Sequence, residues 1–262
     1  MISVKEPIKN VARRVLSEES YGHLVDLYSK VRRDFDDPKN LKKIVRDVKQ
    51  AKIDWLIAKR SLENKDFFFI QVGSCDGVSE DPIYQFVTRF RWRGILVEPV
   101  KHLFEKLLVT YKNQAGLVFE NIAIGRDSGL KTIYRINSTT KAGFVDWYER
   151  SSSFYKEHLL KQLNQIKNDF PGAEIIEEPV LCRPFDYLIE NYNVGKIDLL
   201  HIDAEGYDYE IIKMVPFDRI RPTMIYYESE HLKREDKLSC EKMLATHGYR
   251  LIRAKDTFAY LP

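Results

Sequence analysis

From residue 67 onward, short apolar runs alternate with stretches long enough to form helices. The runs cover residues 67–72, 94–97, 117–124, 197–202 and 223–227. Apolar runs of this length, without alternating polar positions, are typical of parallel strands buried on both faces. The pattern therefore predicts an α/β domain with a doubly wound, mostly parallel, Rossmann-like sheet.

The region before the first run has a different period. Residues 8–33 and 39–63 carry apolar positions at helical spacing, and Asp36-Asp37-Pro38 separates the two stretches. This pattern predicts two helices. We therefore expect an N-terminal helical extension over residues 1–65, followed by the main domain over residues 66–262.

The end of the chain departs from the parallel pattern. Residues 249–253 and 257–261 have strand-like sequences, and only Ala254-Lys255-Asp256 separates them. A parallel pair of strands needs a much longer crossover connection. The spacing predicts a C-terminal antiparallel hairpin.

A long segment near residues 137–184 interrupts the domain between its third and fourth strands. It contains an amphipathic stretch at 155–166, which predicts a helix, and it offers Trp147 and Tyr148 as stacking faces for a sugar ring. An excursion of this length can be a lid or substrate wall, and it can equally be an ornament of the fold. As a lid, it would border the acceptor site and be more mobile without ligand.

The composition excludes several classes of protein. A hydrophobic content of 44% with 12% aromatic residues fits a globular chain rather than a disordered one. The sequence contains no apolar run that could span a bilayer, and its first residues lack a signal-peptide pattern. The three cysteines lack zinc-binding spacing and favour a reducing, cytoplasmic setting.

The charge is small overall but unevenly distributed. The net charge is +3, and residues 1–66 hold 16 Lys and Arg against 11 Asp and Glu. A basic arm suits nucleic acid or an anionic surface, but its acidic residues are interleaved as on a solvated helix face. We expect a small-molecule or glycan partner rather than nucleic acid, and a homo-oligomer remains open.

The residues that follow the first two strands suit a nucleoside ligand without phosphates. Ligands of open parallel sheets bind outside the carboxyl ends of the strands. Gly73 permits a tight turn, while Asp76 in the same loop would repel a pyrophosphate and attract an ammonium or sulfonium group. Glu98 can accept hydrogen bonds from both ribose hydroxyls. Together these residues favour S-adenosylmethionine, and the alternative is that each has only a structural role.

Acidic residues gather after the fourth and fifth strands, at 203–208 and 228–231. Histidine side chains ordinarily titrate near neutral pH, so His231 is the candidate base, and Asp203 is the candidate for orienting the cofactor or the acceptor. The alternatives are a surface histidine at His231 and a helix cap at Glu205 or Asp208, and for Asp208 the cap is the preferred role. We expect no metal, but Asp203, Glu205, Glu228, Glu230 and His231 leave a magnesium-like cation as the alternative.

Four motifs stand in order at four of the predicted strand ends. They are FIQVGSCDG at 69–77, GILVEP at 94–99, NIAIG at 121–125 and IDAEG at 202–206. This order resembles the FkbM family of S-adenosylmethionine-dependent methyltransferases over about residues 67–231. The resemblance implies a class I methyltransferase fold and O-methylation of a hydroxyl on a sugar, glycan or natural product.

The resemblance also assigns the expected cofactor contacts. It places Gly73, Asp76, Gly77 and Glu98 along the cofactor, and Asn121 and Ala123 near the adenine. Two other functions remain as alternatives. A nucleic-acid methyltransferase would typically carry Asp/Asn-Pro-Pro-Tyr/Phe where this chain has Asp203-Ala-Glu-Gly. A binding or scaffold module would keep the fold without turnover.

Overall fold

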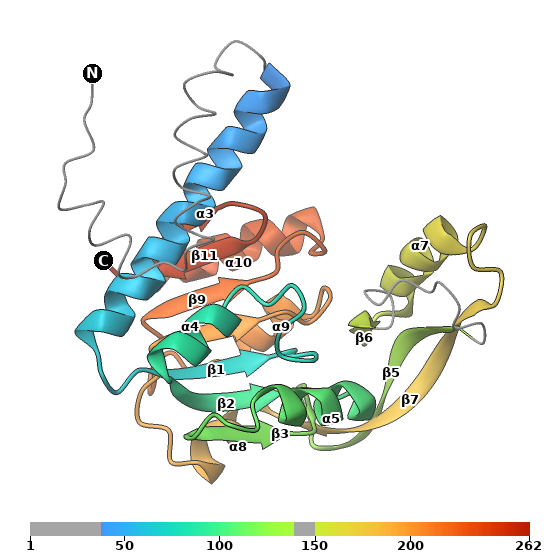
Figure 1. Ribbon diagram of the computed structural model, residues 1–262, viewed down its shortest axis with the longest axis horizontal. Helices are drawn as coiled ribbons and strands as arrows, with labels where there is room; N and C mark the ends of the chain where they lie inside the picture. Colours follow the sequence, from blue (N-terminus) through green and yellow to red (C-terminus); the bar gives the residue numbers. More distant parts are fainter. Residues whose placement is uncertain (1–37, 139–149) are drawn as a thin grey trace.

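The computed structural model describes residues 38–138 and 150–262 and shows a mixed α/β fold (Figure 1). The helix expected over residues 8–33, together with Trp147 and Tyr148, lies outside the described residues. Within the two described ranges, no helix combines the length and the apolar character needed to cross a membrane.

The main sheet has seven strands in the order β10-β11-β9-β8-β1-β2-β3. Its parallel strands are β1 (Phe68–Val72), β2 (Arg93–Val97), β3 (Leu117–Glu120), β8 (Leu199–Ile202) and β9 (Met224–Tyr227). The strands β10 (Arg250–Arg253) and β11 (Thr257–Tyr260) form an antiparallel hairpin, and β11 pairs antiparallel with β9. The predicted mostly parallel sheet with a terminal hairpin is confirmed.

Helices cover both faces of this sheet. Successive strand residues point to opposite sides, so each strand contributes apolar side chains to both faces. Ile70 and Ile95 belong to one buried cluster, whereas Phe69 and Leu96 belong to the other. The Phe69 cluster includes residues of α3 (Pro38–Glu63), α4 (Tyr84–Phe90) and α5 (Lys101–Thr110). The Ile70 cluster includes residues of α8 (Phe185–Asn191), α9 (Asp208–Lys213) and α10 (Arg234–Thr246).

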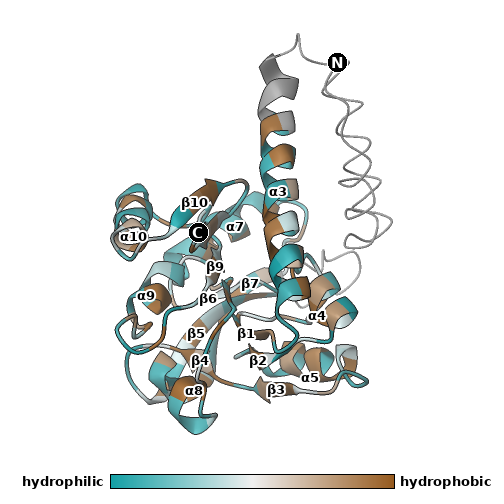
Figure 2. Ribbon diagram, turned by 90° about the vertical axis from the view of Figure 1, so that its left-hand side faces the viewer, coloured by the Kyte–Doolittle hydropathy of each residue, from teal (hydrophilic) through white to brown (hydrophobic). Residues whose placement is uncertain are grey.

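Helix α3 corresponds to the second helix expected before the sheet. Its C-terminal half buries Ile53, Ile57 and Ala58 completely in the core. Its N-terminal half projects beyond the sheet, where Val45 and Val48 are exposed (Figure 2). The boundary expected between the helical extension (1–65) and the main domain (66–262) therefore lies between α3 and the sheet on which α3 packs.

A second, four-stranded sheet stands beside the first and has the order β4-β7-β5-β6. Its strands are β4 (Ala123–Ile124), β5 (Gly129–Ser138), β6 (Ser152–Ser153) and β7 (Ala173–Arg183). The expected helix near 155–166 is α7 (Lys156–Ile166). Its residues Leu159 and Ile166 share a small buried cluster with Ile136 of β5. The excursion therefore has its own core.

The strand expected at 117–124 is broken in the structure. β3 ends at Glu120 in the main sheet, and β4 begins at Ala123 in the second sheet. The second sheet thus begins before residue 137, where the sequence placed the start of the insert. We use the term insert for residues 123–183, of which 123–138 and 150–183 are described.

Candidate active site

A cavity of about 990 Å³ lies at the carboxyl ends of the central strands β1, β2, β8 and β9. In a doubly wound sheet this is the switch point, since β1 connects onward to β2 on one side and pairs with β8 on the other. The opposite wall comes from β6 and α7 of the insert. Ligand pockets commonly reach about 300–1,000 Å³, so the space suits a nucleoside cofactor together with an acceptor.

Gly73 brings two loops of the main sheet together beneath this cavity. β1 and β8 end in register, with Val72 beside Ile202, so that Gly73 adjoins Asp203. Gly73 has a φ of +80°, and a Cβ atom there would lie 1.7 Å from the carbonyl oxygen of Asp203. No side chain fits at this position, which gives a physical reason for the glycine expected in the first motif.

Glu98 lies in the cavity wall at the end of β2 with only 3% of its surface exposed. One carboxylate oxygen accepts the backbone N–H of Cys75 at 2.8 Å, and the other accepts that of Val100 at 2.9 Å. Burial raises the pKa of Glu98 to about 7, although both hydrogen bonds favour the charged form. Each oxygen keeps a further lone pair for a ligand hydroxyl.

The structure brings five of the eight predicted site residues to the cavity. The residues that line it are Gly73, Glu98, Ala123, Asp203 and His231. The other three, Asp76, Gly77 and Asn121, are not among the residues that line it.

Asp76 and Gly77 hold the loop after β1 in place. The Asp76 carboxylate accepts the backbone N–H groups of Val78 and Ser79 and the Ser79 hydroxyl. Partial burial opposes its charge, but these hydrogen bonds lower the pKa of Asp76 below its usual value. Gly77 faces α5, where a Cβ atom would lie 2.6 Å from Leu107. Both positions therefore have a structural reason in this chain.

Asn121 fastens the turn that follows β2. Its side-chain amide donates to the carbonyl oxygen of Glu98 at 2.8 Å and to that of Pro99 at 3.0 Å. These bonds tie the break between β3 and β4 to the loop that carries Glu98. Asn121 thus supports the Glu98 loop from behind the cavity wall.

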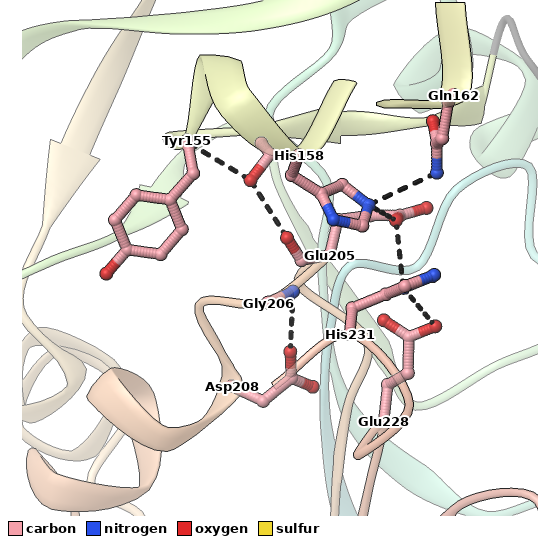
Figure 3. Close-up of polar contacts among 9 residues, drawn as sticks. Tyr155, His158, Gln162, Glu205, Gly206, Asp208, Glu228 and His231 are labelled. Carbon is pink, nitrogen blue, oxygen red and sulfur yellow. Dashed lines mark hydrogen bonds and ion pairs between the residues drawn. The ribbon is translucent and has the colours of Figure 1, made fainter. Parts of the chain in front are cut away.

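The opposite end of the cavity holds a cluster of two histidines and two glutamates, which we call the histidine cluster: His158, Glu205, Glu228 and His231 (Figure 3). Glu205 Oε2 lies 2.9 Å from His158 Nε2 and 3.3 Å from His231 Nδ1. Glu228 Oε1 lies 2.8 Å from the same His231 Nδ1. One carboxylate therefore joins a histidine of the insert to a histidine of the main sheet.

The charges of this cluster shift the pKa values of its members. Partial burial lowers the pKa of His231, but the hydrogen bond and charge of Glu228, with the charge of Glu205, raise it to about 9 overall. Asp203 is exposed to the cavity, yet its recessed position raises its pKa well above the usual value, and the charges of Glu228 and Glu205 act in the same direction. In the free protein this end of the cavity favours protons and other cations.

Asp208, for which the sequence favoured a helix-capping role, is not the N-cap of α9. Tyr207 is the N-cap and makes no side-chain capping bond. Asp208 is instead the first residue of the helix, fully buried, and its carboxylate accepts the N–H of Gly206 at 3.3 Å. It stabilises the turn that positions Glu205, whose φ of +47° is unusual for a residue with a side chain.

The cavity-wall residues that sequence reasoning missed include His158 and Gln50. His158 lies in the first turn of α7 of the insert and belongs to no motif, and it is 47 positions from Glu205 in the sequence. Gln50 comes from α3, where it bonds the Tyr226 hydroxyl at 3.2 Å. The amphipathic pattern of 155–166 identified the helix, but only the tertiary fold reveals that His158 faces the cavity.

Comparison with known proteins adds a family to this geometry. A family model described as the methyltransferase FkbM domain matches residues 71–251. No curated protein matches the sequence.

Several solved structures are similar in fold. An FkbM methyltransferase from Methylobacillus flagellatus KT has 12% identity and a TM-score of 0.46, and the match covers 75% of this chain and 44% of that one. SAH-bound Podospora anserina methyltransferase PaMTH1 has 10% identity and a TM-score of 0.37, with 100% and 98% covered. A fibrillarin/Nop5p complex has 11% identity and a TM-score of 0.38, with 79% and 80% covered. The chain thus spans less than half of the Methylobacillus protein, and the likeness is one of fold alone.

Proposed function

Because the chain belongs to the FkbM family of methyltransferases, with S-adenosylmethionine as cofactor, we propose that it transfers the methyl group to a hydroxyl of a sugar, glycan or other natural product. The observation that carries this proposal is the polarity of one cavity. A buried carboxylate, Glu98, stands at one end, and the histidine cluster stands at the other.

The cavity residues fit this cofactor. Glu98 offers two carboxylate oxygens to the ribose hydroxyls. Gln71 Oε1 and Glu228 Oε2 are buried acceptors in the wall without a partner among the described residues. An unpaired buried acceptor costs free energy, so these oxygens favour a ligand that brings N–H donors or positive charge. The methionine end of S-adenosylmethionine carries both.

Asp203 is proposed to orient the methionine end or the acceptor. It lies in the floor beside Gly73, and its raised pKa reflects its recessed position among other carboxylates. A cationic ligand group nearby would favour its charged form. The protonation state of Asp203 would therefore depend on the positive charge of the cofactor and not on its adenosine.

His231 is proposed to receive the proton of the acceptor hydroxyl. When bound, S-adenosylmethionine supplies an electrophilic methyl group on a sulfonium. The acceptor oxygen bonds to the methyl carbon, the carbon–sulfur bond breaks, S-adenosylhomocysteine leaves, and the hydroxyl proton passes to the imidazole. His231 accepts it only in its neutral form, while Glu228 and Glu205 stabilise the imidazolium that results. The remaining rate enhancement comes from holding the acceptor oxygen in line with the carbon–sulfur bond that breaks.

The test is methyl transfer from labelled S-adenosylmethionine to separate pools of glycans, free sugars, small hydroxylated compounds and RNA. We expect label in a hydroxyl-bearing pool that does not require RNA. Label in RNA would support nucleic-acid methylation instead. S-adenosylhomocysteine binding without transfer to any pool would support a module that keeps the fold without turnover.

A further inference from the structure

We propose that His158, Glu205 and His231 bind a divalent first-row transition-metal ion, such as Zn²⁺ or Mn²⁺. The inference rests on the proposed function only in placing the acceptor beside this cluster. Binding of the ion is a property of the three side chains and can be measured without turnover.

The three side chains already point at one another (Figure 3). One ligand atom from each, either an imidazole nitrogen or a carboxylate oxygen, lies within 4.8 Å of the other two. Glu205 Oε2 lies 2.9 Å from one of the nitrogens and 3.3 Å from the other. An ion bound at about 2.0–2.2 Å from each donor needs donors separated by about 3–3.5 Å, so small side-chain shifts suffice.

The donor set selects the kind of ion. Two imidazole nitrogens with one carboxylate suit Zn²⁺, Mn²⁺ and their neighbours, whereas Mg²⁺ prefers oxygen ligands and retains its water. The sequence led to a magnesium-like cation as the alternative because most of the residues considered there were carboxylates at the strand ends. His158, which only the fold brings to the site, changes the preferred ion.

The surroundings support a bound cation. The side chains of His158 and Glu205 are 14% and 19% exposed, and that of His231 is 30% exposed, so the cluster is partly withdrawn from solvent yet faces the cavity. Glu228 lies beside Glu205 at the same Nδ1 atom of His231, which its Oε1 contacts at 2.8 Å, and its Oε2 is buried without a partner among the described residues. A second carboxylate is thus available as a fourth ligand or as a neighbouring countercharge.

An ion at this position would link two parts of the fold. His158 belongs to α7 of the insert, while Glu205 and His231 follow β8 and β9 of the main sheet. The ion would therefore hold the insert over the acceptor end of the cavity. It would also take up the Nδ1 lone pair of His231, and a coordinated acceptor hydroxyl would be acidified by the ion instead.

The test is calorimetric titration of the chelator-treated, full-length protein with Zn²⁺, with Co²⁺ as a spectroscopic probe of histidine ligation. We expect one ion per chain, not displaced by excess Mg²⁺. His158→Ala and Glu205→Gln should each weaken Zn²⁺ binding at least about tenfold. The matched control is His247→Ala, because His247 stacks on Phe217 outside the cavity and should leave the affinity unchanged.

Two further readouts separate the possible failures. S-adenosylhomocysteine affinity, measured on every variant, reports whether the fold survives, and Glu205→Gln keeps the size of the side chain if His158→Ala does not fold. The metal site would be overturned if the wild type does not bind Zn²⁺, or if both variants bind Zn²⁺ as tightly as the wild type. Either result would leave the proposed methyl transfer standing. Zn²⁺ binding at these residues without methyl transfer to any acceptor would uphold the site and reject the proposed function.

Discussion

The two ends of the cavity are built in different ways. At the Glu98 end, adjacent strands of one sheet fix the geometry, and the carboxylate is held by backbone N–H groups. At the histidine cluster, side chains from two sheets meet. Glu205 accepts the Ser153 hydroxyl of the insert on its carbonyl oxygen at 2.9 Å and faces His158 with its carboxylate. The first end is a property of the main sheet, and the second depends on how the insert docks.

Under the proposed function, the Glu98 end binds the cofactor and the histidine cluster takes part in the reaction. A change at the Glu98 end should alter cofactor affinity and leave the chemistry of the bound state less affected. A change in the histidine cluster should do the reverse. The predictions below follow this division.

The largest effect is expected for His231→Ala. In the metal-free protein, loss of the proposed base should lower turnover by about 10²–10⁴-fold, while S-adenosylhomocysteine affinity stays near that of the wild type. Single-turnover rates and calorimetry measure the two quantities. The matched control is His247→Ala, which should retain full activity. A His231→Ala enzyme that turns over at the wild-type rate would remove this residue from the mechanism.

The second prediction concerns pH in the metal-free protein. His231 must be neutral to accept a proton, and its pKa is raised to about 9. The rate should therefore rise as pH increases from 7, by tens of fold, and level off above about 9. Glu228→Gln removes the main partner that raises this pKa, so the rise should move to lower pH. A rate that is flat from pH 7 to 9 in both proteins would contradict the assignment.

The third prediction tests the opposite end. Glu98→Ala should weaken S-adenosylhomocysteine binding at least tenfold, because each lost bond to a charged acceptor costs about 1.5–3 kcal/mol. Glu105→Ala, an exposed carboxylate on α5, is the control and should bind normally. If saturating cofactor restores the turnover of Glu98→Ala, the division between the two ends is upheld. Unchanged affinity would remove Glu98 from the cofactor site.

The smallest effect is expected in the attachment of the insert. β5 and β7 pair at ten positions, so their amides should be protected from hydrogen exchange in the free protein. Residues 150–155 should exchange faster and become protected when cofactor and acceptor bind. Ser153→Ala removes the hydroxyl that donates to Glu205 and accepts the N–H of Tyr155. Loss of the bond to Glu205 alone, worth about 1 kcal/mol, should speed this exchange about fivefold. Exchange of residues 150–155 that is slow and unaffected by ligands would refute a docking insert.

The strand ends of the main sheet were predictable because their signal is local. Buried parallel strands need unbroken apolar runs, and β1, β2, β8 and β9 all appeared where such runs stand. Gly73, Glu98, Asp203 and His231 followed, since each stands just after a strand. Their roles remain predictions.

The second sheet escaped prediction because its strands lack that signal. β7 reads AEIIEEPVLCR, with a Glu pair and a proline, and exposed residues are interspersed along its length. Residues 117–124 looked continuous, yet Asn121 bonds the carbonyl oxygens after β2 and breaks the strand. His158 could not be assigned for a different reason. Its partners are distant in sequence, and only the docking of α7 brings them together.

The base of the insert has a consequence for how such proteins can diversify. β4 and the end of β7 are hydrogen-bonded neighbours, with Ala123 beside Cys182 and Ile124 beside Arg183. The chain thus enters and leaves the excursion at nearly the same point. Lengthening a segment whose ends are already joined costs little extra closure entropy and does not shift the strands outside it. Evolution, or a designer, can therefore exchange residues 125–181 as a cassette for a new acceptor while the cofactor half is inherited unchanged.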